Sequence, residues 1–358
     1  MEPCLTTAPA EIVYAQANIK IAVGPEPTPE IVNLLKRTVY GTHGPRYQHT
    51  GQEAKINHIQ NPFFFQLLVE EQVIGTYCLS QRLVKTPAGE ALSFYGRYFA
   101  IAPDFMGQGY GSLLKKEAIA YIARVVMAPF LFYSYIEETN QRSLEISKKD
   151  QYQPTGSLEA ILFSRLYPKQ DARFSRLTPD ELPQMLALLR LAYQDYTFVQ
   201  LDRVYHEQNY FVLKENGGII AGLQANPVAW HILHMPGMSG KMIMQVLPHL
   251  PVLRRLINPE NHRFLALEAL YVKPGHEKAL LTLMESTLAF FGYTSALLML
   301  DVNCPLRKTL KDSGKLGIMN ALNKSIYTQV MVKSNGMSEK DIKQYPAQPI
   351  YASAFDFS

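Results

Sequence analysis

The chain has 358 residues, 47% of them hydrophobic, and a formal net charge of only +4 at pH 7. That apolar fraction can fill a folded core, and the length suits two domains better than one. The charge is small and shows no basic run, which argues against nucleic acid as the main partner.

Cysteine usage and the lack of export signals favour the cytoplasm. Three cysteines, Cys4, Cys78 and Cys304, are far apart in the sequence and odd in number. We therefore expect no disulfide framework and no metal site built on them. The first residues lack the basic segment and apolar core of a signal peptide, and no apolar run reaches the length of a membrane span. These features predict a cytoplasmic protein without a bound metal or a membrane partner.

Strands and helices alternate over the first half of the chain. Residues 1–16 show no periodicity and are expected to form a leader. Apolar alternation and turn residues then predict these elements in chain order: a strand over 19–23, a helix capped by Thr28, a hairpin over 63–69 and 73–83, a strand over 95–101, a helix over 112–122, a strand over 131–136, a short helix from Asn140 and a closing strand over 160–166.

The same order of elements returns in the second half, which indicates an internal repeat. The repeated elements are strands over 173–177, 210–213, 219–223, 265–272, 296–302 and 326–332, with helices over 179–193 and 279–291. An insertion over 226–263, rich in methionine and proline, could line a tunnel or a dimer contact, or simply pack as two short helices. We expect a leader (1–16), a first domain (17–169), a second domain (170–335) and a tail (336–358).

A glycine-rich turn after the strand at 95–101 is the most informative stretch. It reads Pro103-Asp-Phe-Met-Gly-Gln-Gly-Tyr-Gly-Ser112 and opens a helix. The first amides of a helix lack internal partners and carry partial positive charge, and glycines let a phosphate approach the backbone. The turn is therefore expected to bind an anion. The glycines alternate and no Gly-Lys-Ser/Thr follows, which excludes a dinucleotide fingerprint and a P-loop.

This turn resembles the pyrophosphate loop of the GNAT acyltransferases, whose pattern is Gln/Arg-x-x-Gly-x-Gly/Ala after a strand that ends in an apolar-x-Pro step. Gly109 and Gly111 occupy the two small positions, whereas Met106 stands where the family prefers Gln or Arg. The resemblance implies an α/β (α+β) fold of two tandem GNAT-like domains, each with a mixed, mostly antiparallel sheet flanked by helices. The second copy has a shorter turn with one glycine, from Pro274 to Ala279, and is expected to be degenerate.

The resemblance also implies acetyl-CoA as co-substrate, bound between the central strand and the next parallel strand. Strand backbone would hold the pantetheine arm, turn amides the pyrophosphate, and an Asn that opens the next helix would touch the CoA arm. The residues at these positions are Phe99, Ala100, Ile101, Gly107, Gln108, Gly109, Tyr110, Gly111, Ser112 and Asn140. Lys115 or Lys116 is a further candidate for contact with a CoA phosphate.

Acyl transfer to an amine requires a neutral nucleophile and a proton for the leaving thiolate. Several branches of the family have a base Glu at the position of Tyr95, which serves here as a base or as a wall of the substrate site. Glu137 is a nearby carboxylate that could replace it as the base. Ser147 stands where the family commonly has the Tyr that protonates the thiolate, so Tyr135 or Tyr152 would take that role.

We thus expect an N-acetyltransferase that moves an acetyl (acyl) group from acetyl-CoA to a primary amine of a small molecule or peptide by direct attack. Two alternatives stay open: a non-catalytic acyl-CoA-binding module, and a transferase of this fold with a longer acyl or aminoacyl donor. A homodimer also stays open. His43, His49 and His58 show no spacing typical of a metal site, so no metal is expected.

Overall fold

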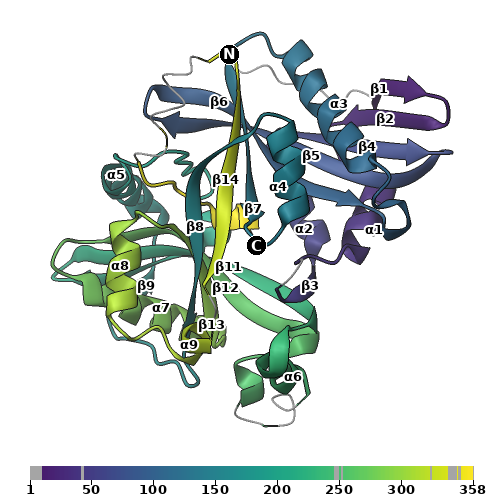
Figure 1. Ribbon diagram of the computed structural model, residues 1–358. Coiled ribbons are helices and arrows are strands. Elements are labelled where there is room, and N and C mark those ends of the chain that lie inside the picture. Colours follow the sequence, from purple (N-terminus) through teal and green to yellow (C-terminus); the bar gives the residue numbers. More distant parts are fainter. Residues whose placement is uncertain are drawn as a thin grey trace.

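One continuous sheet runs through the computed structural model, which describes residues 10–41, 44–245, 250, 253–322, 325–337, 345 and 348–357. Within those residues the sheet has 14 strands in the order β1-β2-β4-β5-β6-β7-β14-β8-β13-β12-β11-β10-β9, and β3 pairs with β11. Among the described strands, parallel pairing joins β6 to β7 and β12 to β13, and the other pairs are antiparallel. Helices flank the sheet along its length (Figure 1). This is the mixed, mostly antiparallel α/β architecture that the sequence predicts.

The first half of the chain supplies the strands and helices at one end of the sheet. They are β1 (Glu11–Gln16), β2 (Ile19–Gly24), α1 (Pro29–Arg37), β3 (Arg46–His49), α2 (Gln52–Ile56), β4 (Pro62–Val69), β5 (Gln72–Thr86), β6 (Gly89–Ile101), α3 (Tyr110–Val125), β7 (Phe130–Glu137), α4 (Gln141–Lys149) and β8 (Gln153–Ser164). No helix in the described residues combines the length and apolar character that a bilayer crossing needs.

The second half supplies the other end of the sheet. Its elements are β9 (Phe174–Arg176), α5 (Leu182–Ala192), β10 (Tyr210–Glu215), β11 (Gly218–His234), α6 (Gly237–Gln245), β12 (His262–Val272), α7 (Glu277–Phe291), β13 (Ser295–Asp301), α8 (Pro305–Asp312), α9 (Ile318–Leu322), β14 (Ile326–Asn335) and α11 (Ala354–Phe357).

The predicted internal repeat is confirmed by the order of these elements. The run β2-α1-β4-β5-β6-α3-β7-α4-β8 corresponds to β9-α5-β10-β11-β12-α7-β13-α8-β14. Each central strand also bulges at one residue with left-handed backbone, Tyr98 (φ 52°) in β6 and Ala269 (φ 48°) in β12. The register of the neighbouring strand shifts at both bulges. Aligning the bulges equates positions in the two halves, for example Arg97 with Glu268.

The closing strands of the two halves cross over, which the sequence does not predict. The expectation that 160–166 and 326–332 each close the sheet of their own half is wrong. β14 lies between β7 and β8, and β8 lies between β14 and β13. Alternating apolar residues define a strand but not its partner, because pairing is decided by long-range contacts. Since the halves share one sheet, the predicted boundary between 169 and 170 stays a prediction.

Both ends of the described chain are ordered where the sequence predicts a leader and a tail. Residues 11–16 form β1, which pairs with β2, a strand that the sequence analysis did not predict within the leader. Residues 350–354 are buried between the two halves, near the middle of the molecule (Figure 1). A short segment with few strongly apolar residues carries no periodic signal, so its burial depends on contacts with distant strands.

The methionine-rich insertion packs on the second half. β11 extends through its first part to His234, and Met235 and Met244 lie against a small core of Ile232, Leu256 and Ile257. This arrangement agrees with the packing alternative. The side chains of Met238 and Met242 lie outside the described residues.

The two faces of the first half have separate cores. Phe65 and Leu67 of β4 pack with Leu114 and Ile122 of α3, whereas Phe64 packs with α1 on the opposite face. Successive side chains of a strand point to opposite faces, so the alternation along β4 separates the two cores. We call these sides the α3 face and the α1 face.

Candidate active site

The parallel strands β6 and β7 separate part-way along the first half. They pair from Leu92 and Phe130 to Tyr95 and Tyr133, where the parallel pairing ends. Beyond this point β6 bulges at Tyr98, while β7 continues beside β14. We call this divergence the β6–β7 fork. Strand backbone without a neighbouring strand on one side can pair with an extended ligand.

The turn after β6 leaves the amides at the head of α3 open. Gly107 and Gly109 have φ angles of 85° and 87°, in the left-handed region that glycine adopts without strain. A Cβ atom at either glycine would meet nothing within 4 Å, and residues 106–109 are exposed. The backbone N–H groups of residues 107–112 donate no hydrogen bond to the described chain. The backbone amides of the turn are therefore open, and no described side chain fills the space beside Gly107 and Gly109.

The head of α3 lies directly against the outer part of β6. A Cβ atom at Gly111 would stand 3.3 Å from the Phe99 ring and 3.6 Å from Ile101 Cγ1. The predicted CoA residues of β6 and of the turn are thus brought together. Gln108 donates a hydrogen bond to the Asp104 carbonyl oxygen (3.2 Å), which holds its side chain back along the turn.

Three small or hydroxyl-bearing residues meet on the α3 face at the start of the fork. A Cβ atom on Gly96 would lie 2.2 Å from the Tyr77 Oη and 2.6 Å from the Ser134 Oγ. We call Gly96, Tyr77 and Ser134 the fork cluster. The Tyr77 hydroxyl is buried without a hydrogen bond of normal geometry, and burial raises its pKa. The neighbouring Ser134 and Tyr152 hydroxyls offset that rise only in part, so the Tyr77 hydroxyl stays protonated at neutral pH.

The opposite, α1 face of the fork carries tyrosines and one carboxylate. Tyr95, Tyr133 and Tyr135 form a cluster of rings with centroids 5.1 to 5.9 Å apart. The Tyr95 hydroxyl donates to the Asp356 carbonyl oxygen (3.1 Å). Burial raises the pKa of Tyr95 and of Tyr135 far above its usual value. Both tyrosines therefore stay protonated at neutral pH, and they suit a wall better than a base.

Glu137 ends β7 beyond these rings and on the same face. Burial raises the pKa of its carboxyl group, and the Thr139 hydroxyl donates a hydrogen bond to it at 3.4 Å. Burial raises the pKa of Tyr47 in β3, and the negative charge of Glu137 raises it further. A half-buried carboxylate with a raised pKa is the usual form of a general base near neutral pH.

Comparison with known proteins agrees with this geometry. Residues 28–149, which contain the turn, the fork and Glu137, match the acetyltransferase (GNAT) family. The chain carries a GNAT domain. No curated protein matches the chain by sequence.

The whole chain also has the fold of a larger acyltransferase. A crystal structure of Saccharomyces cerevisiae N-myristoyltransferase with bound myristoyl-CoA matches 92% of this chain and 86% of its own, at 8% identity and a TM-score of 0.61. A second structure of that enzyme, with myristoyl-CoA and inhibitors, covers 87% of this chain and 80% of its own at 9% identity and a TM-score of 0.57. At such identities the similarity shows the fold alone. It agrees with the GNAT match over residues 28–149.

The predicted contact residues beyond the turn have mixed outcomes in the GNAT domain. Asn140 is the N-cap of α4, because its side chain accepts a hydrogen bond from the Ser143 amide (3.2 Å). The suggestion that Lys115 reaches a CoA phosphate is wrong. Lys115 is only 4% exposed, and its ammonium group donates to Ser147 (2.7 Å) and lies 4.1 Å from the centre of the Tyr152 ring.

Tyr152 lies on the α3 face, away from Tyr95 and Tyr135. Its hydroxyl group is buried and lacks a partner of normal geometry. Its hydroxyl group partly offsets the raised pKa of Tyr77, so Tyr152 lies next to Tyr77 of the fork cluster. The sequence-predicted candidates thus divide between the two faces of the sheet: Tyr95, Tyr135 and Glu137 on one, Tyr152 on the other.

Two of the three histidines considered in the sequence analysis, His49 and His58, lie within the described residues. Within the described residues, no group of three or more His, Cys, Asp or Glu side chains has the arrangement of a metal site. His49 lies in β3, where burial lowers its pKa to about 3, and His58 lies beside His206 with ring centroids 5.7 Å apart. His43 lies outside the described residues.

The fork cluster is the part of the site that the sequence analysis missed. Tyr77 and Ser134 are 57 positions apart and belong to strands with ordinary alternation. Gly96 was the one indication in the sequence, because a glycine inside a strand often marks the close approach of another group. Its partners could be found only from the register of three strands.

Proposed function

We propose that this protein is an N-acyltransferase that moves a short acyl group, acetyl in the simplest case, from acyl-CoA to a primary amine. The observation that carries the proposal is the row of open amides from Gly107 to Ser112, next to the β6–β7 fork. These amides and the positive end of the α3 dipole favour a diphosphate. Phe99 and Ile101 then offer strand backbone to the pantetheine arm.

The amine is proposed to arrive from the α1 face, where Glu137 removes its proton. A primary amine has a pKa of about 10, so it is protonated and unreactive near neutral pH until a base acts. The free amine nitrogen attacks the thioester carbonyl carbon, the C–N bond forms and the C–S bond breaks. Glu137 takes the ammonium proton before the attack and passes it to solvent, and it then takes the second proton that leaves nitrogen as the amide forms. Tyr95 and Tyr135 form the wall of this side.

The leaving thiolate is proposed to take its proton from the fork cluster. The Tyr77 hydroxyl is protonated, has no hydrogen bond of normal geometry and lies where β6 and β7 diverge. After it gives its proton to the thiolate, it regains one from solvent. Tyr152, predicted from the sequence as the donor, stands behind Tyr77 and supports it. This arrangement separates acid and base on the two faces of the sheet, so neither neutralises the other.

One alternative has its own supporting observation. The fold resembles that of N-myristoyltransferase, whose structure holds myristoyl-CoA, so a longer acyl donor is the second candidate. A third, a CoA-binding module without activity, follows if binding occurs without transfer.

Thermal shift and calorimetric titration with CoA, acetyl-CoA and acyl-CoAs of increasing chain length test donor choice. We expect acetyl-CoA to bind at least as tightly as the longer donors, and thiol release to depend on added amine. Binding that strengthens steadily with chain length would favour the longer donor. Binding without thiol release over a broad amine panel would favour the inactive module. Absence of CoA binding would overturn the proposal.

A further inference from the structure

Two arginines share one carboxylate on the α1 face of the fork, and a third arginine lies near them. Arg82 of β5 forms a two-bond ion pair with Asp356 of α11 (2.8 and 3.0 Å), and Arg97 of β6 lies 3.9 Å from the same carboxylate. The side chains of Arg82, Arg97 and Asp356 are only 7%, 5% and 2% exposed. Arg203 completes the group, with its guanidinium 4.1 Å from the centre of the Phe355 ring.

The group carries more positive than negative charge. No described residue accepts a hydrogen bond from the guanidinium of Arg203 or from the Nε and Nη1 atoms of Arg97. Burial lowers the pKa of Arg203 most, Arg97 and Arg82 lower it further, and the opposing effects of Asp356 and Glu268 are smaller. Buried charges are normally paired, so an unpaired excess of guanidinium groups marks a place for an anion.

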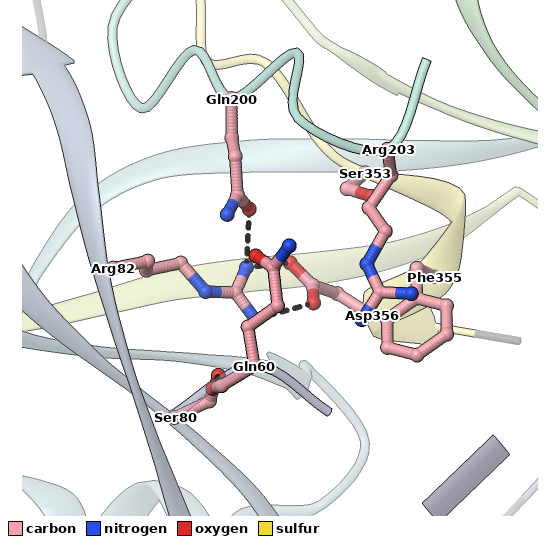
Figure 2. Close-up of a pocket in the computed structure, with 8 residues that line it drawn as sticks. All are labelled: Gln60, Ser80, Arg82, Gln200, Arg203, Ser353, Phe355 and Asp356. Carbon is pink, nitrogen blue, oxygen red and sulfur yellow. Dashed lines mark hydrogen bonds and ion pairs between the residues drawn. The ribbon is translucent and has the colours of Figure 1, made fainter. Parts of the chain in front are cut away.

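A small pocket opens onto this excess charge. It is lined by Gln60, Ser80, Arg82, Gln200, Arg203, Ser353, Phe355 and Asp356. Figure 2 shows the Arg82 guanidinium bonded to Asp356 and Gln200, with Gln60 across from it and Arg203 extended beside the Phe355 ring. Gln200 turns its side-chain oxygen to Arg82 and donates its Nε2 to Asp202 (3.4 Å), so Gln60 is the amide that adds a further donor. The enclosed space is about 10 Å³, room for about one water molecule, and the Asp356 carboxylate also lines it. A small planar anion would therefore lie at its mouth, where Arg203 is half-buried and Gln60 is exposed.

The pocket lies close to the place proposed for the acceptor amine. Arg82 lies over the ring of Tyr95, 4.8 Å from its centre, and also donates to the Tyr133 hydroxyl (3.3 Å). Tyr95 and Tyr133 are the last parallel pair before the fork. A group bound in the pocket is therefore within one or two side-chain lengths of the diverging strands.

We propose that this pocket binds a carboxylate of the acceptor, so that the favoured substrate is a small amine that also carries a carboxylate group, as an amino acid does. This inference rests on the proposed acyl transfer and narrows its acceptor class. Arg203, which forms no ion pair with a described residue, meets the carboxylate first. Arg82 and Arg97 hold Asp356 in place and supply the excess positive charge.

Matched pairs of amines test the proposal in the thiol-release assay with acetyl-CoA. Each amino acid is compared with its own amide, which keeps the amine and the side chain but lacks the negative charge. We expect kcat/KM for the best amino acid to exceed that of its amide about tenfold or more, the range of a hydrogen bond to a charged group. Equal rates for acid and amide throughout the panel would overturn the proposal.

Formate provides a readout that does not depend on transfer. In thermal shift of the full chain, formate should stabilise the wild type more than formamide does, and Arg203→Gln should remove that difference. Arg176→Gln is the control, because Arg176 also lies over aromatic rings, 5.3 Å from that of Phe290, but at the far end of the sheet. Arg82→Met leaves Asp356 unpaired and is expected to impair folding, so Arg203→Gln is the deciding variant.

The outcomes separate this proposal from the proposed function. If CoA binds and formate acts alike on the wild type and on Arg203→Gln, the carboxylate pocket is wrong and acyl transfer stands. If formate binds as expected but CoA does not, acyl transfer is wrong and only an anion pocket remains. An effect of formate that Arg176→Gln also removes would identify nonspecific ion binding and would overturn the pocket.

Discussion

The two halves of the molecule share one fold but use the same backbone groups differently. At the head of α7 the Glu277 carboxylate accepts a hydrogen bond from the Gly275 amide (2.9 Å), and backbone hydrogen bonds lower the pKa of Glu277. The second half thus places its own anion at the helix N-terminus. In the first half the corresponding amides, 107–112, have no partner in the described chain.

The strands show the same contrast. After the bulge of β12, the carbonyl oxygens of Ala269 and Leu270 accept hydrogen bonds from the hydroxyls of Tyr210 and Tyr193, both at 2.9 Å. No described side chain hydrogen-bonds to the carbonyl oxygens of the two corresponding residues of β6. The fork cluster also has no polar counterpart. Aligned through the bulges, its three positions in the second half are Leu223, Leu298 and Leu267.

This comparison explains how one fold serves two purposes in one chain. A half that satisfies its own helix amides and strand carbonyls gains stability and has nothing left to offer a ligand. A half that leaves them open gives up that stability and can pair with a nucleotide thioester. The capacity to bind a ligand therefore depends on which backbone amides and carbonyls are left unpaired, and the fold alone does not determine it.

The largest expected effect comes from placing an anion where the first half lacks one. Gly109→Glu should lower the affinity for CoA roughly a hundredfold or more, because its carboxylate competes with the diphosphate for the open amides. Calorimetric titration with CoA measures this directly.

Gly275→Glu is the matched control for the turn. Both glycines have positive φ, 87° for Gly109 and 82° for Gly275, and open space around the missing Cβ. Each substitution therefore carries a similar backbone strain of about 1 kcal/mol. Unchanged CoA affinity in Gly109→Glu, or lost affinity in Gly275→Glu, would reverse the assignment of roles to the halves.

The next largest effect is expected at the carboxylate that ends the second parallel strand of each half, Glu137 in β7 and Asp301 in β13. Glu137→Gln should lower kcat about a hundredfold with little change in KM for acyl-CoA, the range for loss of a general base. Its counterpart Asp301 accepts a hydrogen bond from the Asn303 amide (2.8 Å), which is a structural role. Asp301→Asn should therefore leave kcat unchanged. Thiol release under saturating donor distinguishes the two.

The pH dependence of Glu137 sharpens the same test. Burial raises its pKa, and a base works only when deprotonated, so kcat of the wild type should fall as the pH drops through that raised pKa. This acid limb should vanish in Glu137→Gln. Because the folded state favours the protonated carboxyl, stability from this group is full below the unfolded pKa of about 4.3. It is lost as the pH rises through the folded pKa, so Glu137→Gln should gain stability over the wild type only at the higher pH.

The sequence predicted what depends on local pattern. The repeat, the turn from Pro103 to Ser112 and the N-cap role of Asn140 all follow from spacing along one segment. The exchange of β8 and β14, the burial of 350–354 and the meeting of Tyr77 with Ser134 depend on which distant strands pair. Alternation predicts a strand but carries no information about its neighbour. Lys115 illustrates the limit, because its burial against Ser147 contradicts the usual exposure of lysine.

The smallest effects are expected when one buried tyrosine hydroxyl group is removed from either half. Tyr210→Phe removes the hydrogen bond to the Ala269 carbonyl oxygen and leaves that buried oxygen unpaired, so urea unfolding should show a loss of about 1–3 kcal/mol. Tyr77→Phe removes a hydroxyl that has no partner of normal geometry. Its stability should therefore change by less than about 0.5 kcal/mol, while its kcat falls because the thiolate loses its proton donor. A Tyr77→Phe variant with reduced stability and unchanged kcat would mean that the first half, like the second, uses its buried hydroxyl only to hold the fold together.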